Sequence, residues 1–406
     1  MSIAQTLIPD VLELIAEQLE KGRGTTHPDA LSFALVCKGW HAAGIKELYR
    51  DLEGTLAGAE KAISARPELA QHVRRLTVLL DPQYKADLRL VGSLPRLRVI
   101  EARGRSTPNF DLFKKLGSSP SIPVLRALCL QAYNGTAQLD VADLFALLER
   151  ATCLRTFSLF ALPGHLKSTS AAPSRPFRLH HLSLHYPHSA EEDDETRFSS
   201  ATAGQVQTLL FTAFDFSSLR SFSTYIDQGE SILYSRLAAA TNLRTLKLCN
   251  DNLAVAPSLA GISRLLPSLP TLRSFELTVL HYDHFILSGS RATSNAELES
   301  LLAAFAPTLR HLSLSIVFVG GASHPALSGF LKIRRAGPLQ KVEVYHPAEN
   351  GRTGRLLLRK VRTTGGEGDE NDPTAWQWLE PSICVAAGSD AGAQASTAMG
   401  LETVPQ

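Results

Sequence analysis

The sequence predicts an α/β protein in which a small helical module precedes an array of strand–helix repeats, stacked into a parallel sheet with helices on its outer side. Three observations predict this class. A phrase of the form LxxLxL returns ten times between Val73 and Tyr345. Helix-like stretches such as VADLFALLERAT precede several of these copies. Two amphipathic helical patterns lie before the first copy, within residues 1–52.

The first helical pattern is IPDVLELIAEQL, which starts at Ile8. Pro9 suits the first turn of a helix, because its missing N–H would have no partner there. Leu12, Ile15 and Leu19 then recur at the spacing of one helix face. We expect an amphipathic helix over this stretch.

The second helical pattern is LSFALVCKGWHAAGIKELYRDL, with a start near Pro28. Val36 and Trp40 form one of its apolar pairs at helical spacing. Gly39 and Gly44 each weaken a helix by about 1 kcal/mol relative to alanine, so we expect a break near Gly44. A module of this size is marginal as a free-standing core, so its exposed apolar residues need a partner or the following repeats to cover them.

The repeated phrase alternates apolar and polar residues over its last positions, the signature of a strand with one buried face. Successive copies are separated by 24, 28, 29, 25, 40, 24, 29, 37 and 30 residues. No unit can cover its own apolar face, so the units must stack. The copies begin at Val73, Leu97, Leu125, Leu154, Leu179, Leu219, Leu243, Leu272, Leu309 and Leu339.

Over residues 73–345 these phrases resemble the leucine-rich repeats of the cysteine-lacking, helix-containing sort. Such repeats have a period of roughly 20 to 29 residues, which most of the intervals match. The resemblance implies a leucine-rich-repeat solenoid with a parallel sheet and outer helices. Residues 186–214 and 279–297 account for the two long intervals and are expected to be loops or excursions. The first includes the acidic run EEDDE, which we interpret as a solvated loop.

Side chains between the apolar positions of each phrase should point to the concave face of the sheet. These side chains are mostly small, polar and uncharged, which suits contact with a peptide or protein and argues against tracking of phosphates. The alternative is that they are simply tolerated on an exposed strand. The candidate target-binding residues on this face are Phe160, His181, His185, Tyr225, Lys247, Glu276, His311 and Tyr345.

The second position of the phrase is arginine in eight of the ten copies. Stacked strands would place these side chains about 4.8 Å apart, so the guanidinium groups must be paired or directed into water. We interpret them as a structural ladder that covers helix or loop carbonyls, with an anion-binding stripe as the alternative. The eight residues are Arg74, Arg98, Arg126, Arg155, Arg220, Arg244, Arg273 and Arg310.

Motifs for catalysis and metal binding are absent from the sequence: it has no GxxxxGK[ST], GxSxG or HExxH stretch. His181 and His185 would stand roughly 13 Å apart on one strand, too far to ligate one metal. The stretch from His281 to His284 encloses an aspartate but offers no third ligand. We therefore expect no metal, no cofactor and no enzyme activity, with a site among His181, His185 and Tyr225 as a minor alternative.

Composition restricts the partners and the compartment. The chain carries 41 Lys+Arg against 39 Asp+Glu, a formal net charge of +2, which provides no global field for nucleic acid or an anionic membrane. Charged residues interrupt the apolar N-terminus, which excludes a signal peptide, and no stretch reads as a membrane span. The five cysteines are an odd number without a CxxC pair, as expected for the reducing cytoplasm or nucleus.

The two N-terminal patterns together resemble the F-box-like segment of fungal-type F-box proteins, through IPDVLELIAEQL, the VCKGW core and the LYRDL ending. RPELAQHVRRLTV resembles the usual junction of these proteins into leucine-rich repeats. The resemblance implies binding of a Skp-type adaptor, and through it a cullin–RING ubiquitin ligase. Carried onto matching positions, the adaptor-facing candidates are Ile8, Pro9, Leu12, Ile15, Leu19, Leu31, Val36, Cys37 and Trp40.

Trp40 is the expected anchor among these candidates, because buried tryptophans dominate interface energetics. One position departs from the family pattern: Ala16 stands where a bulky aromatic residue is common, which removes apolar contact area. The resemblance implies a non-catalytic substrate receptor whose repeats hold a protein target. The alternative is an interaction scaffold whose F-box-like helices only cap the repeats.

The predicted domain order is a helical module over residues 1–52, a linker helix over 53–71, a solenoid of about ten repeats over 72–362 and a mostly disordered tail over 363–406. The tail contains a short segment, residues 372–384, with Trp376 and Trp378. We expect this segment to cap the open end of the solenoid, since terminal repeats need covering; a motif for a partner is the alternative.

Overall fold

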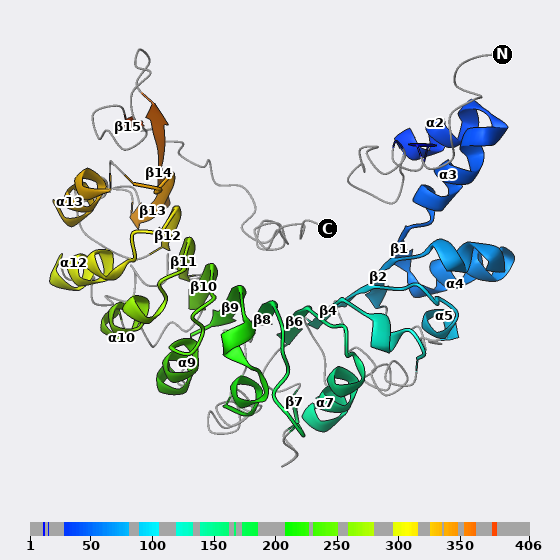
Figure 1. Ribbon diagram of the computed structural model, residues 1–406, viewed down its shortest axis with the longest axis horizontal. Coiled ribbons are helices and arrows are strands. Elements are labelled where there is room, and N and C mark those ends of the chain that lie inside the picture. The colour runs from blue at the N-terminus through cyan, green and yellow to red at the C-terminus, as the bar shows by residue number, and fades with distance from the viewer. Residues whose placement is uncertain are drawn as a thin grey trace. The chain divides into compact units, whose positions relative to one another are not determined.

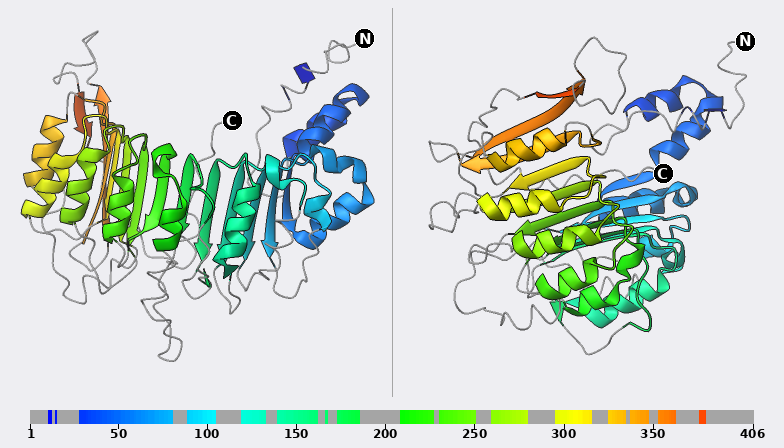
Figure 2. Two further views of the ribbon diagram at one scale, coloured as in Figure 1. Left: turned by 60° about the horizontal axis from the view of Figure 1, so that its bottom comes forward. Right: turned by 60° about the vertical axis from the view of Figure 1, so that its left-hand side comes forward.

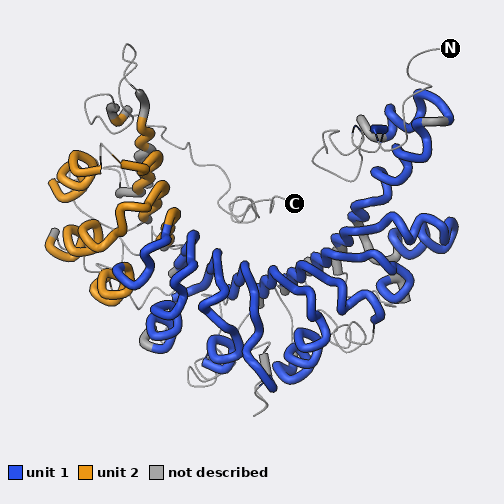
Figure 3. The backbone as a smooth tube through the Cα atoms, viewed as in Figure 1, with its two compact units in different colours: residues 1–252, 267–272 blue, residues 253–266, 273–406 orange. Residues whose placement is uncertain are grey.

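The computed structural model of the chain (Figure 1) divides into two compact units, coloured separately in Figure 3. Unit 1 comprises residues 1–252 and 267–272, and unit 2 comprises residues 253–266 and 273–406. The structure describes residues 11–12, 15, 28–80, 89–104, 119–132, 139–161, 166–167, 173–185, 208–226, 230–250, 259–279, 295–315, 325–334, 337–347, 353–362 and 376–379.

Two helices, α2 (Pro28–Val36) and α3 (Lys38–Leu48), form the described part of the N-terminal module. The break between them falls at Cys37, whose backbone is extended at φ −162° and ψ 170°. Its carbonyl accepts the N–H groups of Trp40 at 3.1 Å and His41 at 3.0 Å, which begins α3. The break expected near Gly44 is therefore wrong, and α3 runs through that glycine.

Gly44 is instead a point of close contact between the two helices. A Cβ atom built on Gly44 would lie 2.5 Å from the Cβ of Ala34 and 2.6 Å from its Cα. The glycine thus lets α3 lie directly on α2. Beside this contact, Leu12, Phe33 and Ala43 form a small buried cluster, and Trp40 packs against it.

The sheet of unit 1 has strands in the order β1-β2-β3-β4-β6-β8-β9-β10, and every neighbouring pair is parallel. Figure 1 and Figure 2 show that helices cover one face of this sheet. The strands are β1 (Asp51–Thr55), β2 (Arg75–Leu80), β3 (Val99–Gly104), β4 (Ala127–Ala132), β6 (Thr156–Ala161), β8 (His181–His185), β9 (Ser221–Tyr225) and β10 (Thr245–Asn250).

The remaining elements of unit 1 connect these strands. The helices are α4 (Leu56–Ala65), α5 (Arg89–Gly92), α7 (Val141–Arg150), α9 (Glu230–Leu237) and a segment at 208–213, and the 3-10 turns are η2 (Pro67–His72), η3 (Ile122–Val124) and η6 (Phe216–Ser218). A separate pair of short strands, β5 (Leu139–Asp140) and β7 (Leu166–Lys167), lies outside the main sheet.

Helix α7 illustrates how one repeat is built. The Asp140 side chain accepts the N–H of Ala142 at 2.8 Å and so caps the first turn. The helix buries Val141, Leu144, Phe145, Leu147 and Leu148, the stripe expected of an amphipathic helix. The chain then turns into β6, whose phrase buries its three apolar positions, as the sequence pattern predicts.

Unit 2 has the same alternation, with α10 (Leu259–Leu265), β11 (Ser274–Val279), α12 (Asn295–Ala304), β12 (His311–Ser315), α13 (Pro325–Ile333) and β13 (Lys341–Pro347). The 3-10 turn η7 (Leu266–Ser268) begins in unit 2 at Leu266, and its other two residues belong to unit 1. Strands β11, β12 and β13 are parallel. The ten predicted phrases thus all form strands, β2 to β4, β6 and β8 to β13, and the leucine-rich-repeat fold class is confirmed.

The end of unit 2 reverses direction. Strand β14 (Thr353–Arg362) pairs antiparallel with β13, and β15 (Trp376–Leu379) pairs antiparallel with β14. Between β13 and β14 lie residues 348–352, too few for the crossover that a parallel strand needs. The indole N–H of Trp378 donates to the Leu331 carbonyl in α13 at 3.2 Å, so β15 is attached to the last helix as well as to the sheet.

Candidate functional site

Apolar side chains are exposed on α2, on the side that the small cluster leaves uncovered. Leu31 is 51% exposed, Leu35 is 72% exposed and Val36 is 54% exposed. Leu31 and Leu35 are four residues apart and therefore share one face of the helix. Val11 and Ile15, each 38% exposed, add to the apolar surface of the module. We call Leu31, Leu35 and Val36 the α2 face.

The adaptor-facing candidates divide into three groups. Ile15, Leu31 and Val36 are exposed, and Cys37 is half-buried. Leu12 lies in the core of the module, and Trp40 is half-buried with its ring centroid 4.6 Å from that of Phe33. Both therefore support α2 from behind, and the anchoring role expected of Trp40 stays a prediction. Ile8, Pro9, Ala16 and Leu19 lie outside the described residues.

Leu35 is a residue that sequence reasoning missed. Its exposure follows from the helix break at Cys37: once α3 starts anew, the apolar residues of α2 and α3 no longer lie on one continuous face. The sequence did indicate this exposure: five consecutive apolar residues, 33–37, lie all around a helix, so they cannot all face one buried side.

On the uncovered face of the unit 1 sheet, an aromatic row crosses three strands. Phe160 on β6, His185 on β8 and Tyr225 on β9 occupy equivalent positions in the parallel register. The Phe160 and His185 rings stack with centroids 6.1 Å apart, and the His185 and Tyr225 rings meet edge to face at 5.1 Å. These three residues, the aromatic row, pack against one another as cross-strand neighbours.

The aromatic row is more buried than an open binding surface. Phe160 is 7% exposed, His185 8% and Tyr225 3%. Among the other target-binding candidates, His181 on β8 and Lys247 on β10 are half-buried. The row is thus closely packed, and the half-buried residues elsewhere on the same sheet face offer the polar groups that a partner could reach.

Three target-binding candidates belong to unit 2. Glu276 on β11 is half-buried and His311 on β12 is exposed. Tyr345 lies on β13, and its side chain is outside the described residues. The structure therefore brings Phe160, His185 and Tyr225 together in unit 1. The other three candidates, Glu276, His311 and Tyr345, belong to unit 2.

His185 sits in an unusual electrostatic position. Its Nε2 is 3.0 Å from the Ser223 hydroxyl, while Nδ1 is buried without a hydrogen-bond partner among the described residues. Burial, followed by repulsion from the Lys247 ammonium, lowers the pKa of His185 to about 4. The imidazole is therefore neutral at pH 7. A base this weak captures protons poorly at neutral pH, so the Ser223–His185 pair is better suited to packing and hydrogen bonding than to activating a nucleophile.

Charged side chains on the uncovered sheet face are found in local pairs. Arg75 donates to the Glu101 carboxylate through Nε at 3.1 Å and Nη2 at 2.6 Å. In unit 2, the Lys341 ammonium lies 2.8 Å from the Glu343 carboxylate. Such pairing keeps buried carboxylates such as Glu101 compensated, and it explains why this face carries little net charge.

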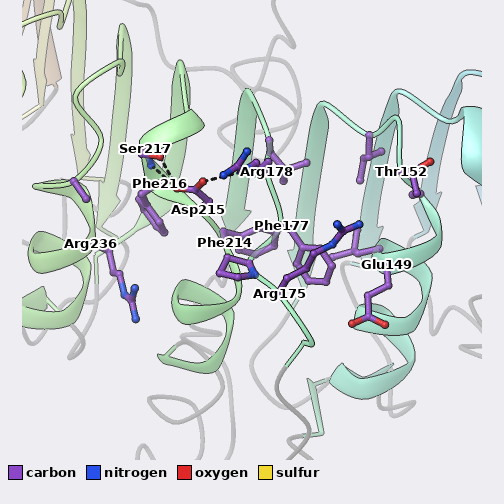
Figure 4. Close-up of a pocket in the computed structure, with 16 residues that line it drawn as sticks. Glu149, Thr152, Arg175, Phe177, Arg178, Phe214, Asp215, Phe216, Ser217 and Arg236 are labelled. Carbon is purple, nitrogen blue, oxygen red and sulfur yellow. Dashed lines mark hydrogen bonds and ion pairs between the residues drawn. The ribbon is translucent and has the colours of Figure 1, made fainter.

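A groove of about 690 Å³ opens where the strands of unit 1 begin, beside the C-terminal end of α7 (Figure 4). Arg178 approaches Asp215 at 3.3 Å, and Asp215 accepts from the N–H of Ser217 at 3.1 Å. Glu149 accepts from the N–H and hydroxyl of Ser174 at 3.0 and 2.9 Å, and these bonds lower its pKa. The groove thus carries carboxylates on both sides.

Sequence reasoning did not anticipate this groove, because it lies in the segments between repeats rather than in the repeated phrase. Residues Phe177 and Phe214 form an isolated parallel bridge, in which Phe177 N–H donates to Ala213 at 2.8 Å and Asp215 N–H donates to Phe177 at 2.9 Å. The cluster of arginine and aromatic residues in APSRPFRL is the one sequence signal that pointed here.

The described residues contain neither a metal-binding cluster nor a membrane-spanning helix. No group of three or more His, Cys, Asp or Glu side chains there is placed to hold a metal ion. The stretch His281–His284 lies outside the described residues. None of the described helices has the length and apolar character needed to cross a membrane.

Comparison with known proteins gives no family assignment: no family model matches, and no curated protein matches. Solved structures are similar at low identity. One is a chain of the crystal structure of the yeast Rad7 and Elc1 complex, with 15% identity, a TM-score of 0.41, and coverage of 83% of this chain and 88% of that one. Another, from the TLR13–ssRNA13 complex, has 15% identity, a TM-score of 0.33, and coverage of 70% and 43%. The protein therefore spans less than half of the second chain.

Proposed function

We propose that this protein is a non-catalytic substrate receptor of a Skp–cullin–F-box ubiquitin ligase. In this role the N-terminal module docks on a Skp-type adaptor, and the repeats bind a protein target. The α2 face carries the proposal: three neighbouring apolar side chains, each more than half exposed, need a protein partner to remove them from water.

The repeats supply the second half of this function. Half-buried polar groups such as His181 and Lys247 lie on the same sheet face as the aromatic row, a combination that suits a protein target. The receptor would act by proximity, raising the effective concentration of target lysines near the ligase subunits. We expect it to work in the reducing cytoplasm or nucleus, because the four cysteines among the described residues form no disulfide.

A double substitution on the α2 face tests adaptor docking. Leu31→Asp with Leu35→Asp places two carboxylates on this face, and we expect the affinity for a purified Skp-type adaptor to fall at least tenfold, as for loss of about 1.4 kcal/mol or more. Binding is measured by calorimetry with the full chain. Ser32→Asp is the matched control, because Ser32 is exposed on the same helix and is not part of the α2 face.

Four outcomes are decisive. The control variant should bind like the wild type, and the double variant should keep the helical content of the wild type. A wild-type chain that fails to bind the adaptor contradicts the receptor function. Equal loss in both variants would show that charge on α2, rather than its apolar face, limits binding.

The alternative is a scaffold without a ligase role, and one observation favours it. Strand β1 follows α3 after two residues and pairs along its whole length with β2, from Asp51 opposite Arg75 to Thr55 opposite Leu79. The module is thus joined to the first repeat, as a cap would be. A cap needs no exposed apolar face, so the α2 face favours the receptor.

A further inference from the structure

A line of arginine residues runs along the start of the unit 1 sheet. Each of these arginines is the last residue before a strand. Its backbone N–H donates to the backbone carbonyl of the residue at the equivalent position before the neighbouring strand, at 2.7 to 2.9 Å. His180 occupies the equivalent position before β8. We call the six arginines the arginine stripe: Arg74, Arg98, Arg126, Arg155, Arg220 and Arg244.

The guanidinium groups of the arginine stripe have no acidic partner in the described part of the chain. Five of the six side chains are exposed, and Arg74 is half-buried. Within the described residues, none of the six makes an ion pair, and none donates a side-chain hydrogen bond to a helix or loop carbonyl. Within the described residues these six groups therefore cover no carbonyls, in contrast to the structural ladder expected from the sequence.

Arg50, which occupies the equivalent position before β1, provides the contrast. It is 8% exposed, and its Nη1 lies 3.3 Å from the Glu47 carboxylate. A structural arginine in this fold is thus buried and paired. The members of the arginine stripe are exposed or half-buried, and none has an ion-pair partner among the described residues.

Stacking places like charges next to one another. Desolvation, followed by repulsion from Arg126 and Arg74, lowers the pKa of Arg98 below its usual value. Like charges directly opposite each other on neighbouring strands destabilise a sheet. Carboxylates bound along the stripe would relieve this repulsion, and guanidinium groups bind carboxylates through two parallel hydrogen bonds.

The surroundings of the stripe select the kind of partner. The groove beside its centre is lined by the carboxylates of Glu149 and Asp215 and by Arg175, Arg178 and Arg236, so the charge beside the stripe is mixed rather than uniformly cationic. A nucleic-acid duplex needs many phosphate contacts over a wide surface. The stripe spans seven strands, or about 29 Å at 4.8 Å per strand, which an extended peptide of about nine residues would cover.

We propose that the arginine stripe binds an extended acidic segment of a partner protein, with aspartate or glutamate carboxylates paired to the guanidinium groups of successive repeats. The stripe and the α2 face are separate surfaces. Acidic-segment binding is therefore independent of the proposed adaptor function and is tested without the adaptor.

The experiment measures binding of a fluorescent peptide of alternating glutamate and serine, about ten residues long, to the full chain. The test variant is Arg126→Gln, Arg155→Gln and Arg220→Gln together. The control variant is Arg66→Gln, Arg150→Gln and Arg264→Gln, which removes the same charge from exposed positions outside the stripe. A peptide of alternating lysine and serine is the control ligand, and circular dichroism checks that both variants are folded.

We expect the test variant to bind the acidic peptide at least tenfold more weakly than the wild type, and the control variant to stay within about twofold. Raising the salt from about 50 to about 300 mM should weaken wild-type binding, because exposed ion pairs are screened. No binding by the wild type, or equal loss in both variants, would overturn the proposal.

Two further measurements test other ligands for the arginine stripe, a nucleic acid and the protein's own acidic run. A single-stranded oligonucleotide that binds more tightly than the peptide, with the same dependence on the stripe, would replace the acidic peptide by a polyphosphate. Replacing Glu191, Glu192, Asp193, Asp194 and Glu195 by their amides should leave peptide affinity unchanged. A tenfold gain there would assign the stripe to the protein's own acidic run and overturn the partner proposal.

Discussion

At the scale of single residues, His185 shows how burial alters the chemistry of a side chain that the sequence presents as ordinary. A histidine four residues from another on a predicted strand reads as an exposed surface group. In the structure it lies between Phe160 and Tyr225 and is 8% exposed. Register and ring packing, which depend on neighbouring repeats, cannot be read from the strand pattern alone.

The lowered pKa of His185 predicts a pH-dependent stability. An unfolded chain takes up the proton near pH 6.5, whereas the folded chain takes it up only near pH 4. Stability from this residue is therefore complete above pH 6.5 and is lost as the pH falls toward 4. Between pH 7.5 and 5 we expect a loss of about 2 kcal/mol in the free energy of unfolding, measured by urea denaturation.

His185→Gln should remove this part of the pH dependence, because glutamine does not titrate. His41→Gln is the control, since His41 is exposed and lies in the helical module rather than in the aromatic row. Equal pH dependence in the wild type and in His185→Gln would contradict the assignment. The groups facing the imidazole are the hydroxyl of Ser223, the Tyr225 ring and the Lys247 ammonium.

Gly44 gives a second lesson about residues. Helix propensity alone predicts a break at this glycine, but propensity is a weak preference that packing overrides. Because Gly44 has no Cβ, α3 can lie against Ala34 of α2, and this contact outweighs the propensity cost. The break occurs at Cys37, a position without any helix-breaking residue type.

At the scale of elements, the C-terminal strands illustrate how a repeat array can end. β15 is the last strand in the order of unit 2, and Trp378 connects it to α13 through the indole N–H. Residues 363–375 and 380–406 of the predicted tail lie outside the described residues. The pairing of β14 with β15 places the tryptophan-containing segment over an edge that would otherwise expose unpaired backbone groups.

Trp378 variants test this edge. Trp378→Phe keeps an aromatic ring but removes the donor to Leu331, so we expect a loss of about 1 kcal/mol. Trp378→Ala also removes the packed ring and should cost about 3 kcal/mol. Hydrogen exchange of β14 and α13 amides reports both effects. Gln377→Ala, in the same strand, serves as the control, and an equal effect of that variant would contradict the role of the indole.

Elements differ in how well the sequence predicted them. The ten strands β2 to β4, β6 and β8 to β13 follow from a phrase that returns ten times, since repetition removes the ambiguity of a single short strand. β1 was missed: residues 51–55 were assigned to the module ending and the linker helix, because DLEGT carries no repeat phrase. This strand forms because β2 offers it an edge, which is tertiary information.

At the scale of the whole molecule, an array of repeats distributes its stability between neighbours. We predict that Phe222→Ala in β9 costs about 3 to 5 kcal/mol, because this side chain is fully buried. The accelerated hydrogen exchange should concentrate in β8, β9 and β10 and fade toward β2. Phe275→Ala in β11 should affect unit 2 in the same local manner.

A uniform rise in exchange across all strands after Phe222→Ala would contradict nearest-neighbour stability and would indicate one cooperative core. Ser217→Ala, at an exposed position ahead of β9, is the control for local sequence change. Its hydroxyl pairs with Asp215 at 2.6 Å near the surface, so a small effect is expected.

The architecture of the molecule was predictable, whereas its surfaces were not. Repeat spacing and alternation determine the sheet, the helix-covered face and the stacked arginines. The α2 face, the groove and the exposure of the arginine stripe depend on contacts between segments distant in sequence. Such contacts leave no periodic signal, so they become evident only in three dimensions.

The short connection between α3 and β1 fixes the orientation of the helical module relative to the first strands of the sheet. Tyr49 and Arg50 separate the helix from the strand, Arg50 is held by Glu47, and its carbonyl accepts the N–H groups of Arg74 and Arg75 at 2.8 and 3.0 Å. The connection is therefore short and hydrogen-bonded rather than a flexible linker. A protein bound to α2 would keep a fixed orientation relative to β1 and β2, and the backbone would also set its orientation relative to any ligand bound on those strands.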